Sequence, residues 1–148
     1  MKYTQEITIN LPRVEVIKLF NNADNLKKWQ PGLVSFKHLS GKSGNRGAKS
    51  TLLFKENGRE IEMIETILVS NFPDEFSAKY ETSVVENWQE NHFSKEGPNK
   101  TNWRTENEFR FSGLYKLMRI FMRGSFPKQS YKYLQYFKDF AEKRSSAN

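Results

Sequence analysis

The sequence predicts an α+β fold in which an antiparallel sheet curves around one long helix at the C-terminal end of the chain. Between residues 32 and 111 the chain reads as consecutive strand patterns separated by turn signals. In the last third, apolar residues recur at spacings of three and four, which places them on one helix face. A long helix gripped by a sheet tends to leave a hollow between the two, and we expect the function to lie in that hollow.

The N-terminal segment is predicted to form one strand followed by two short helices. Residues 2–10 alternate between two faces, which is typical of a half-buried strand. Asn10 can cap a helix, and Pro12 suits the first turn of that helix because its missing N–H needs no partner there. We therefore expect a short helix that reaches Phe20 and a second one over Ala23–Trp29.

Six further strand patterns follow the two short helices. They are Val34–Leu39, Ala48–Lys55, Arg59–Val69, Phe76–Val84, Glu86–Lys95 and Thr101–Phe111. Asn57-Gly58 is the strongest turn signal in the chain, and it favours a type I′ hairpin because both residues can adopt positive φ.

The C-terminal helix pattern starts at Leu114 and extends to about Arg144. The segment Gly124–Pro127 interrupts the pattern. Pro127 removes a backbone donor and crowds the preceding turn, so we expect a kink or a break that could serve as a hinge or portal.

The composition favours one domain over residues 1–148 with an aromatic core or pocket wall, because 12 Phe, 6 Tyr and 3 Trp are present. The absence of cysteine excludes thiol catalysis and thiolate metal sites. The two histidines, His38 and His92, lie on different predicted strands, so we expect no metal site and no cofactor. We find no transmembrane-length apolar run and no signal-peptide pattern, and we predict a cytoplasmic protein without integral membrane association.

Charge is distributed unevenly along the chain. Residues 60–112 carry 5 Lys and Arg against 11 Asp and Glu, whereas residues 113–148 carry 8 against 2. This arrangement indicates complementarity between an acidic sheet and a basic helix. A basic stripe along the helix could meet a lipid surface transiently, but it lacks the aromatic platform of a nucleic-acid binder. The stripe comprises Lys116, Arg119, Arg123, Lys128 and Lys132.

Two segments of the chain resemble the START-like, Bet v 1-like superfamily, also called SRPBCC or the polyketide cyclase/dehydrase and lipid-transport group. The first segment is ITINLPRVEVIKLFNNADNLKKWQPG, similar to the opening strand and helices of the family, and the second is NKTNWRTENEFRFSGLYKLM, similar to its last strand and helix start. The resemblance spans nearly the whole chain. It implies a helix-grip fold, a seven-stranded antiparallel sheet wrapped around the C-terminal helix, but no single activity.

Alternation along the strands predicts which side chains face the hollow. The register of Glu86–Lys95 is open, because Phe93 favours odd-numbered residues inward and Trp88 favours even-numbered ones. We prefer the first register, since Phe93 lies near the hairpin that leads to Trp103. The predicted ligand-binding residues are Glu65, Met63, Tyr80, Gln89, Asn91, Trp103, Thr105, Asn107, Phe109, Leu117, Phe121 and Met122.

Glu65 is the most informative of these residues. A carboxylate between the apolar residues Met63 and Ile67 is costly to bury unless it is paired or hydrogen-bonded. Glu65 could titrate at raised pKa as an acid or base, anchor a polar group of a ligand, or form a structural pair with an arginine or tyrosine.

The sequence therefore favours a protein that binds a small hydrophobic or amphipathic molecule, such as a lipid or a polyketide-like compound. The first alternative is a cyclase or dehydratase-type enzyme, in which Glu65 transfers a proton and Asn91 or Tyr80 polarises a carbonyl group. The second alternative is a co-chaperone-like interaction domain. We prefer binding because the sequence offers no nucleophile–base pair and no metal-ligand set.

Overall fold

The computed structural model describes residues 1–113 and 125–146 of the 148-residue chain. In chain order the elements are β1 (Lys2–Ile9), α1 (Arg13–Phe20), the 3-10 helix η1 (Ala23–Asn25), α2 (Leu26–Trp29), β2 (Leu33–Ser40), β3 (Lys49–Glu56), β4 (Arg59–Asn71), β5 (Glu75–Glu81), β6 (Val85–Gly97), β7 (Lys100–Phe111) and α4 (Ser125–Ser146). This order confirms the predicted α+β class, with two short helical segments after the first strand and a long helix at the C-terminal end.

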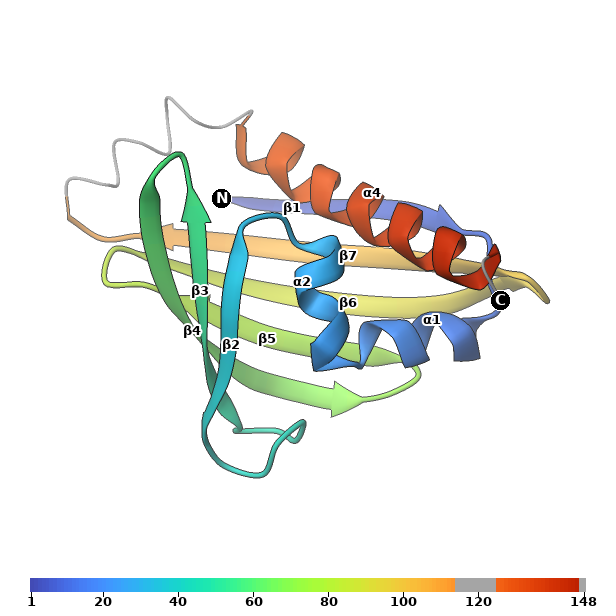
Figure 1. Ribbon diagram of the computed structural model, residues 1–148, viewed down its shortest axis with the longest axis horizontal. Helices are drawn as coiled ribbons and strands as arrows, with labels where there is room; N and C mark the ends of the chain where they lie inside the picture. The colour runs from blue at the N-terminus through green and yellow to red at the C-terminus, as the bar shows by residue number, and fades with distance from the viewer. Residues whose placement is uncertain (114–124, 147–148) are drawn as a thin grey trace.

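The seven strands form one antiparallel sheet in the order β1-β7-β6-β5-β4-β3-β2. Strands β2 to β7 pair with one another in chain order, and β1 lies at the edge of the sheet beside β7. Register shifts occur in the β2–β3 and β4–β5 pairs, where they help a sheet to bend. The sheet curves, and α4 runs along β1 on its concave side (Figure 1).

The β3–β4 hairpin turns where the sequence predicts, because Asn57 and Gly58 have φ values of 51° and 77°. The predicted helix cap was wrong. Pro12 is the N-cap of α1, and the backbone N–H of Asn10 donates to Glu142 Oε1 on α4 at 3.1 Å. Asn10 therefore connects the end of β1 to the C-terminal helix instead of starting α1.

Aromatic rings fill the space between α4 and one end of the sheet. The ring of Phe20 packs against Trp103 from β7 and Phe137 from α4, with both centroid distances at 5.7 Å. Trp29 contacts Phe137 at 5.1 Å, so α2 belongs to the same cluster. Phe137 and the neighbouring Leu134 are almost completely buried. This packing fixes α4 against the sheet at one end.

The other end of α4 is tied to β1 by hydrogen bonds. The Tyr3 hydroxyl bonds to Ser130 Oγ at 2.6 Å, and Gln5 Nε2 donates to the Pro127 carbonyl at 2.6 Å. Pro127 lies in the first turn of the described part of the helix. The predicted helix start at Leu114 and the first residue of the predicted break, Gly124, lie outside the described residues. The rest of that segment, residues 125–127, is helical, so no break occurs within its described part.

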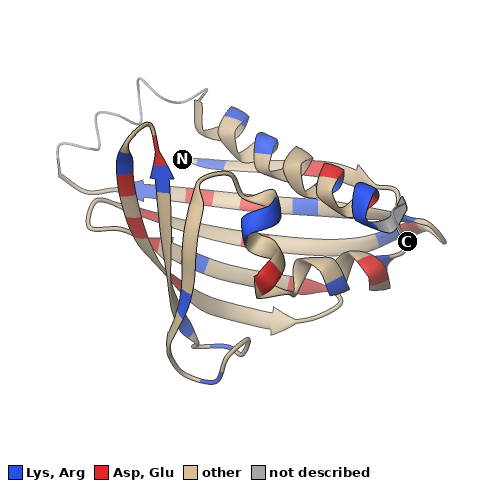
Figure 2. Cartoon of the chain, viewed as in Figure 1, with Lys and Arg blue, Asp and Glu red and all other residues tan. Residues whose placement is uncertain are grey.

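Several other predictions also concern residues that the structure does not describe. They are the ligand-facing residues Leu117, Phe121 and Met122 and the basic residues Lys116, Arg119 and Arg123. Figure 2 shows charged residues of both signs on the strands and on α4. Four of the Lys or Arg ion pairs among the described residues are local to one element: Lys79–Glu81, Arg104–Glu106, Arg110–Glu108 and Lys138–Glu142. Over residues 1–113 and 125–146, no helix has the length and apolar character needed to cross a membrane.

Candidate functional site

A cavity of about 620 Å³ lies between the concave face of the sheet and the helices α2 and α4. Its wall combines rings from the sheet, such as Phe76 and Phe109, with rings from the helices, such as Phe20 and Tyr133. Pockets that hold small molecules commonly have volumes of roughly 300–1,000 Å³ and largely apolar walls. The volume of this cavity falls within that range, and its wall is largely apolar.

Glu65 and Tyr80 form the most polar feature of the cavity wall. They lie directly opposite each other on β4 and β5, and the Tyr80 hydroxyl is hydrogen-bonded to the Glu65 carboxylate. The Glu65 residue is only 8% exposed, and in the described part of the chain no lysine or arginine forms an ion pair with it. Glu65 is thus a buried carboxyl group with a neutral partner.

Burial sets the protonation of both groups. Burial raises the pKa of Glu65, and the hydrogen bond from Tyr80 offsets part of that rise. Burial, followed by the charge of Glu65, raises the pKa of Tyr80 well above its ordinary value. Tyr80 therefore remains a neutral hydrogen-bond donor, while Glu65 holds a proton at higher pH than a solvated glutamate does.

The Glu65–Tyr80 pair belongs to a polar row that crosses the sheet in register. Ser50 lies opposite Glu65 on β3, and Asn87 lies opposite Tyr80 on β6. Neighbouring strands lie about 4.8 Å apart, so adjacent members of the row are within reach of one small molecule. All four residues line the cavity.

Asn91 has a structural role in the cavity wall. Its Oδ1 accepts a hydrogen bond from Trp103 Nε1 at 3.0 Å, and its Nδ2 donates to the Phe76 carbonyl at 3.1 Å. The residue is 2% exposed. Both ends of the Asn91 amide are therefore engaged, which leaves it poorly suited to polarise a carbonyl group of a substrate.

Asn87 and the remaining predicted amides, Asn107 and Gln89, differ in how far they are engaged in hydrogen bonds. Asn87 Nδ2 donates to Asn107 Oδ1 at 3.3 Å, and Asn107 Nδ2 donates to Thr105 Oγ1 at 3.5 Å. Gln89 also lines the cavity, and its side chain has no hydrogen-bond partner among the described residues. Among the predicted amides, Gln89 is thus the one most available to a bound molecule.

The structure brings eight of the twelve predicted residues together in the cavity wall. They are Glu65, Met63, Tyr80, Gln89, Asn91, Trp103, Asn107 and Phe109. Thr105 is 0% exposed and is not a lining residue, because it pairs with Gln5 where β1 meets α4. The register preferred for β6 is the observed one, with Phe93 buried and Trp88 on the other face beneath the Arg110 guanidinium.

Sequence reasoning missed the lining residues that come from helices and turns. Examples are Phe20 on α1, Phe72 after β4, and Tyr133 on α4. Alternation along strands assigns no side chain of a helix or a turn to the cavity. The only available signal was the concentration of aromatic residues near the ends of these elements.

No protein-family model matches the chain, and no curated protein sequence matches it either. Solved structures do match. The Zhui aromatase/cyclase from Streptomyces sp. R1128 aligns with 98% of this chain and 95% of its own, with a TM-score of 0.82 and 11% identity. A START superfamily protein from Mycobacterium smegmatis aligns over 96% and 97%, with a TM-score of 0.72 and 10% identity.

Norcoclaurine synthase from Thalictrum flavum, solved in complex with dopamine and hydroxybenzaldehyde, aligns with 97% of this chain and 87% of its own. Its TM-score is 0.72 and its identity is 10%. Identities this low are informative about the fold, and function must be argued from the site. The chain has the helix-grip fold of the START-like, Bet v 1-like superfamily.

Proposed function

We propose that this protein binds a small, largely apolar molecule that carries hydroxyl or carbonyl groups. The observation that supports this most strongly is the buried Glu65–Tyr80 pair inside a cavity of about 620 Å³ with a largely apolar wall. Burial of the apolar part of a ligand would supply most of the binding free energy. The polar row would orient the ligand.

The polar groups of the wall suit a ligand that both donates and accepts hydrogen bonds. Ionised Glu65 accepts a hydrogen bond from a ligand hydroxyl, and protonated Glu65 donates one to a carbonyl. Trp29 adds a donor, because its indole N–H is buried and has no partner among the described residues. An unpaired buried donor is unfavourable by about 1–3 kcal/mol, so an acceptor on the ligand or a water molecule would be stabilising there. A hydroxylated lipid or polyketide-like compound has this chemistry.

The expected affinity sets the concentrations for the experiment. Drug-sized ligands gain about 0.3 kcal/mol per non-hydrogen atom. A ligand with about 20 such atoms would then bind with about 6 kcal/mol, which corresponds to a Kd of tens of micromolar. Ligands should accordingly be screened up to the millimolar range.

Thermal unfolding with a panel of fatty acids, sterols, flavonoids and aromatic polyketides tests the proposal. At 100 times its Kd a ligand stabilises the folded state by about 2.7 kcal/mol, which is easily measured. Glu65→Gln should weaken binding of the best ligand. Glu62→Gln, which changes an exposed residue on the other face of β4, should leave that binding unchanged. No stabilisation by any class of compound would reject the proposal.

A second candidate function is proton-transfer catalysis of the cyclase or dehydratase type. The raised pKa of Glu65 inside the cavity favours this candidate, because an acid or base of that kind works best near the operating pH. Tyr80 would then be the group that polarises a carbonyl, since Asn91 is engaged with Trp103. Glu65→Gln would abolish turnover while the substrate still binds; full turnover in this variant would exclude the mechanism.

A further inference from the structure

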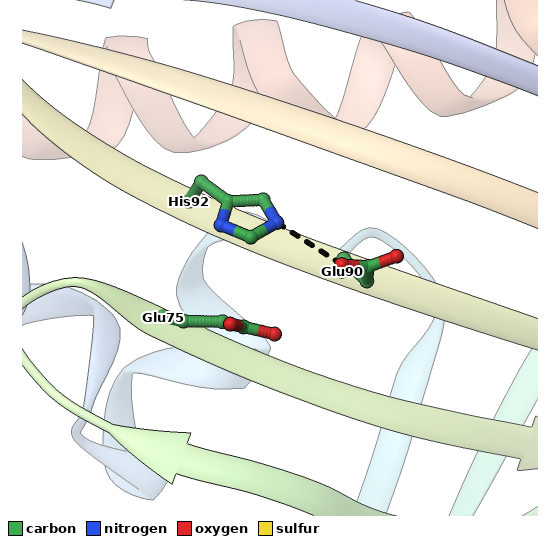
Figure 3. Close-up of side chains that lie close together, drawn as sticks. All are labelled: Glu75, Glu90 and His92. Carbon is green, nitrogen blue, oxygen red and sulfur yellow. Dashed lines mark hydrogen bonds and ion pairs between the residues drawn. The ribbon is translucent and has the colours of Figure 1, made fainter.

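The face of the sheet opposite the cavity carries a compact group of two glutamates and a histidine. Glu75 lies on β5 directly across from His92 on β6, and Glu90 lies two residues before His92 on the same face. One ligand atom from each of the three residues lies within 4.8 Å of the others. Figure 3 shows Glu90 and His92 on one strand and Glu75 on the neighbouring strand.

We infer that Glu75, Glu90 and His92 form a binding site for a divalent first-row transition metal ion such as Zn²⁺. An imidazole nitrogen combined with carboxylate oxygens suits Zn²⁺ and Co²⁺ better than Mg²⁺ or Ca²⁺, which prefer oxygen ligands alone. Three protein ligands with one further position for water is a common arrangement for zinc. We call this group the outer-face triad.

The geometry of the outer-face triad is close to that of a metal site. His92 Nε2 and Glu90 Oε1 are 3.2 Å apart. Two ligand atoms at about 2.0–2.1 Å from a tetrahedral zinc ion lie about 3.3 Å apart, so this pair already has the required separation. A small rotation of the flexible Glu75 side chain would complete the set. The Ser77 hydroxyl already orients that carboxylate by donating to Glu75 Oε2 at 2.5 Å.

The charges around the outer-face triad also favour a cation. Glu90 lies directly opposite Glu106 on β7, and like charges in that relation are destabilising. Arg104 is bonded to Glu106 at 2.9 Å, while His92 Nε2 lies 3.8 Å from the same carboxylate. No lysine or arginine of the described chain forms an ion pair with Glu75 or Glu90. A bound divalent cation would relieve the repulsion among these carboxylates.

The outer-face triad is independent of the proposed ligand site. The adjacent residues Asn91 and Phe93 are buried on the cavity side, so Glu90 and His92 point away from it. The full site could not be predicted from the sequence, because Glu75 and His92 are distant along the chain and are brought together only by the β5–β6 register. A single histidine suffices when the sheet supplies two carboxylates beside it.

Calorimetric titration of the tag-free, chelator-treated full chain with ZnCl₂ and CoCl₂ tests this inference. We expect one ion per chain and a Kd raised at least tenfold by His92→Gln, Glu75→Gln or Glu90→Gln. His38→Gln is the matched control, since it removes the other histidine, which is exposed on β2, and should leave the Kd unchanged. Equal affinity in His92→Gln and the unaltered protein, or no binding at millimolar zinc, would overturn the assignment.

Histidine NMR provides a readout that does not depend on any variant being folded. Paramagnetic Co²⁺ added to the unaltered protein should shift or broaden the imidazole signals of His92 and leave those of His38 sharp. Equal effects on both histidines, or an effect on His38 alone, would show that the metal binds elsewhere and would refute the site.

Discussion

Replacement of Asn91 by leucine tests whether the amide holds the cavity wall together. Leucine has the same branched arrangement of side-chain non-hydrogen atoms as asparagine, with bulkier methyl ends, so the change keeps the shape of the side chain and removes its hydrogen-bonding groups. It leaves the indole N–H of Trp103 and the carbonyl of Phe76 without the partners they have at 3.0 and 3.1 Å. Each buried group left unpaired costs about 1–3 kcal/mol. We expect Asn91→Leu to lower the free energy of unfolding by about 3 kcal/mol, which corresponds to a fall in Tm of about 10 °C.

Urea unfolding of four proteins separates this effect from a general loss of packing. They are the unaltered chain, Asn91→Leu, Trp103→Phe and the double variant, which together give the coupling energy of the pair. We expect a coupling of about 1 kcal/mol or more, because Trp103→Phe removes the donor that Asn91→Leu leaves unpaired. Gln89→Leu is the control, since Gln89 has no hydrogen-bond partner among the described residues, and it should change stability by less than about 0.5 kcal/mol. A loss in Asn91→Leu no larger than that of the control would refute the structural role.

Three further predictions concern the buried carboxyl group, the core and a turn. The folded-state pKa of Glu65 is raised, so its favourable contribution is present below the unfolded-state pKa and is lost as pH rises through the folded-state value. Glu65→Gln should therefore gain stability relative to the unaltered protein as pH rises, and a difference independent of pH in urea unfolding would contradict this. Phe137 is 0% exposed, so Phe137→Ala should lower the free energy of unfolding by about 3–5 kcal/mol. Tyr136→Ala, on the exposed side of the helix, should lower it far less in the same assay. Gly58→Ala should lower the free energy of unfolding by about 1 kcal/mol, because Gly58 has a φ of 77°. Gly97→Ala should not lower it, because φ is not positive at Gly97. Equal losses of stability in thermal unfolding would argue against the type I′ turn.

The predicted strands and their inward faces were largely confirmed because they depend on local, repeating patterns. Alternation in β7 placed Trp103, Asn107 and Phe109 on the inner face, and the positive φ that Asn57-Gly58 tolerates fixed the β3–β4 hairpin. These features are set by residues that are neighbours in sequence. They could therefore be read without knowledge of the tertiary structure.

Other features could not be predicted because they depend on contacts between distant elements. Thr105 faces inward as alternation predicts, but its position beside Gln5 under the start of α4 removes it from the cavity. Asn91 faces inward too, but its partner Trp103 comes from another strand. Alternation identifies the face of a strand and does not show what covers that face or which groups pair across it.

A fluorescence titration with 8-anilinonaphthalene-1-sulfonate tests the central claim, which is that the cavity beneath α4 admits a guest molecule. The probe should bind the folded protein saturably, at one site, with a Kd in the tens of micromolar. Met63→Trp, which places a larger side chain in the cavity, should weaken binding at least tenfold, and Ile64→Trp on the opposite face of β4 should not. Binding that fails to saturate, or that is equally strong in both tryptophan variants, would contradict the account.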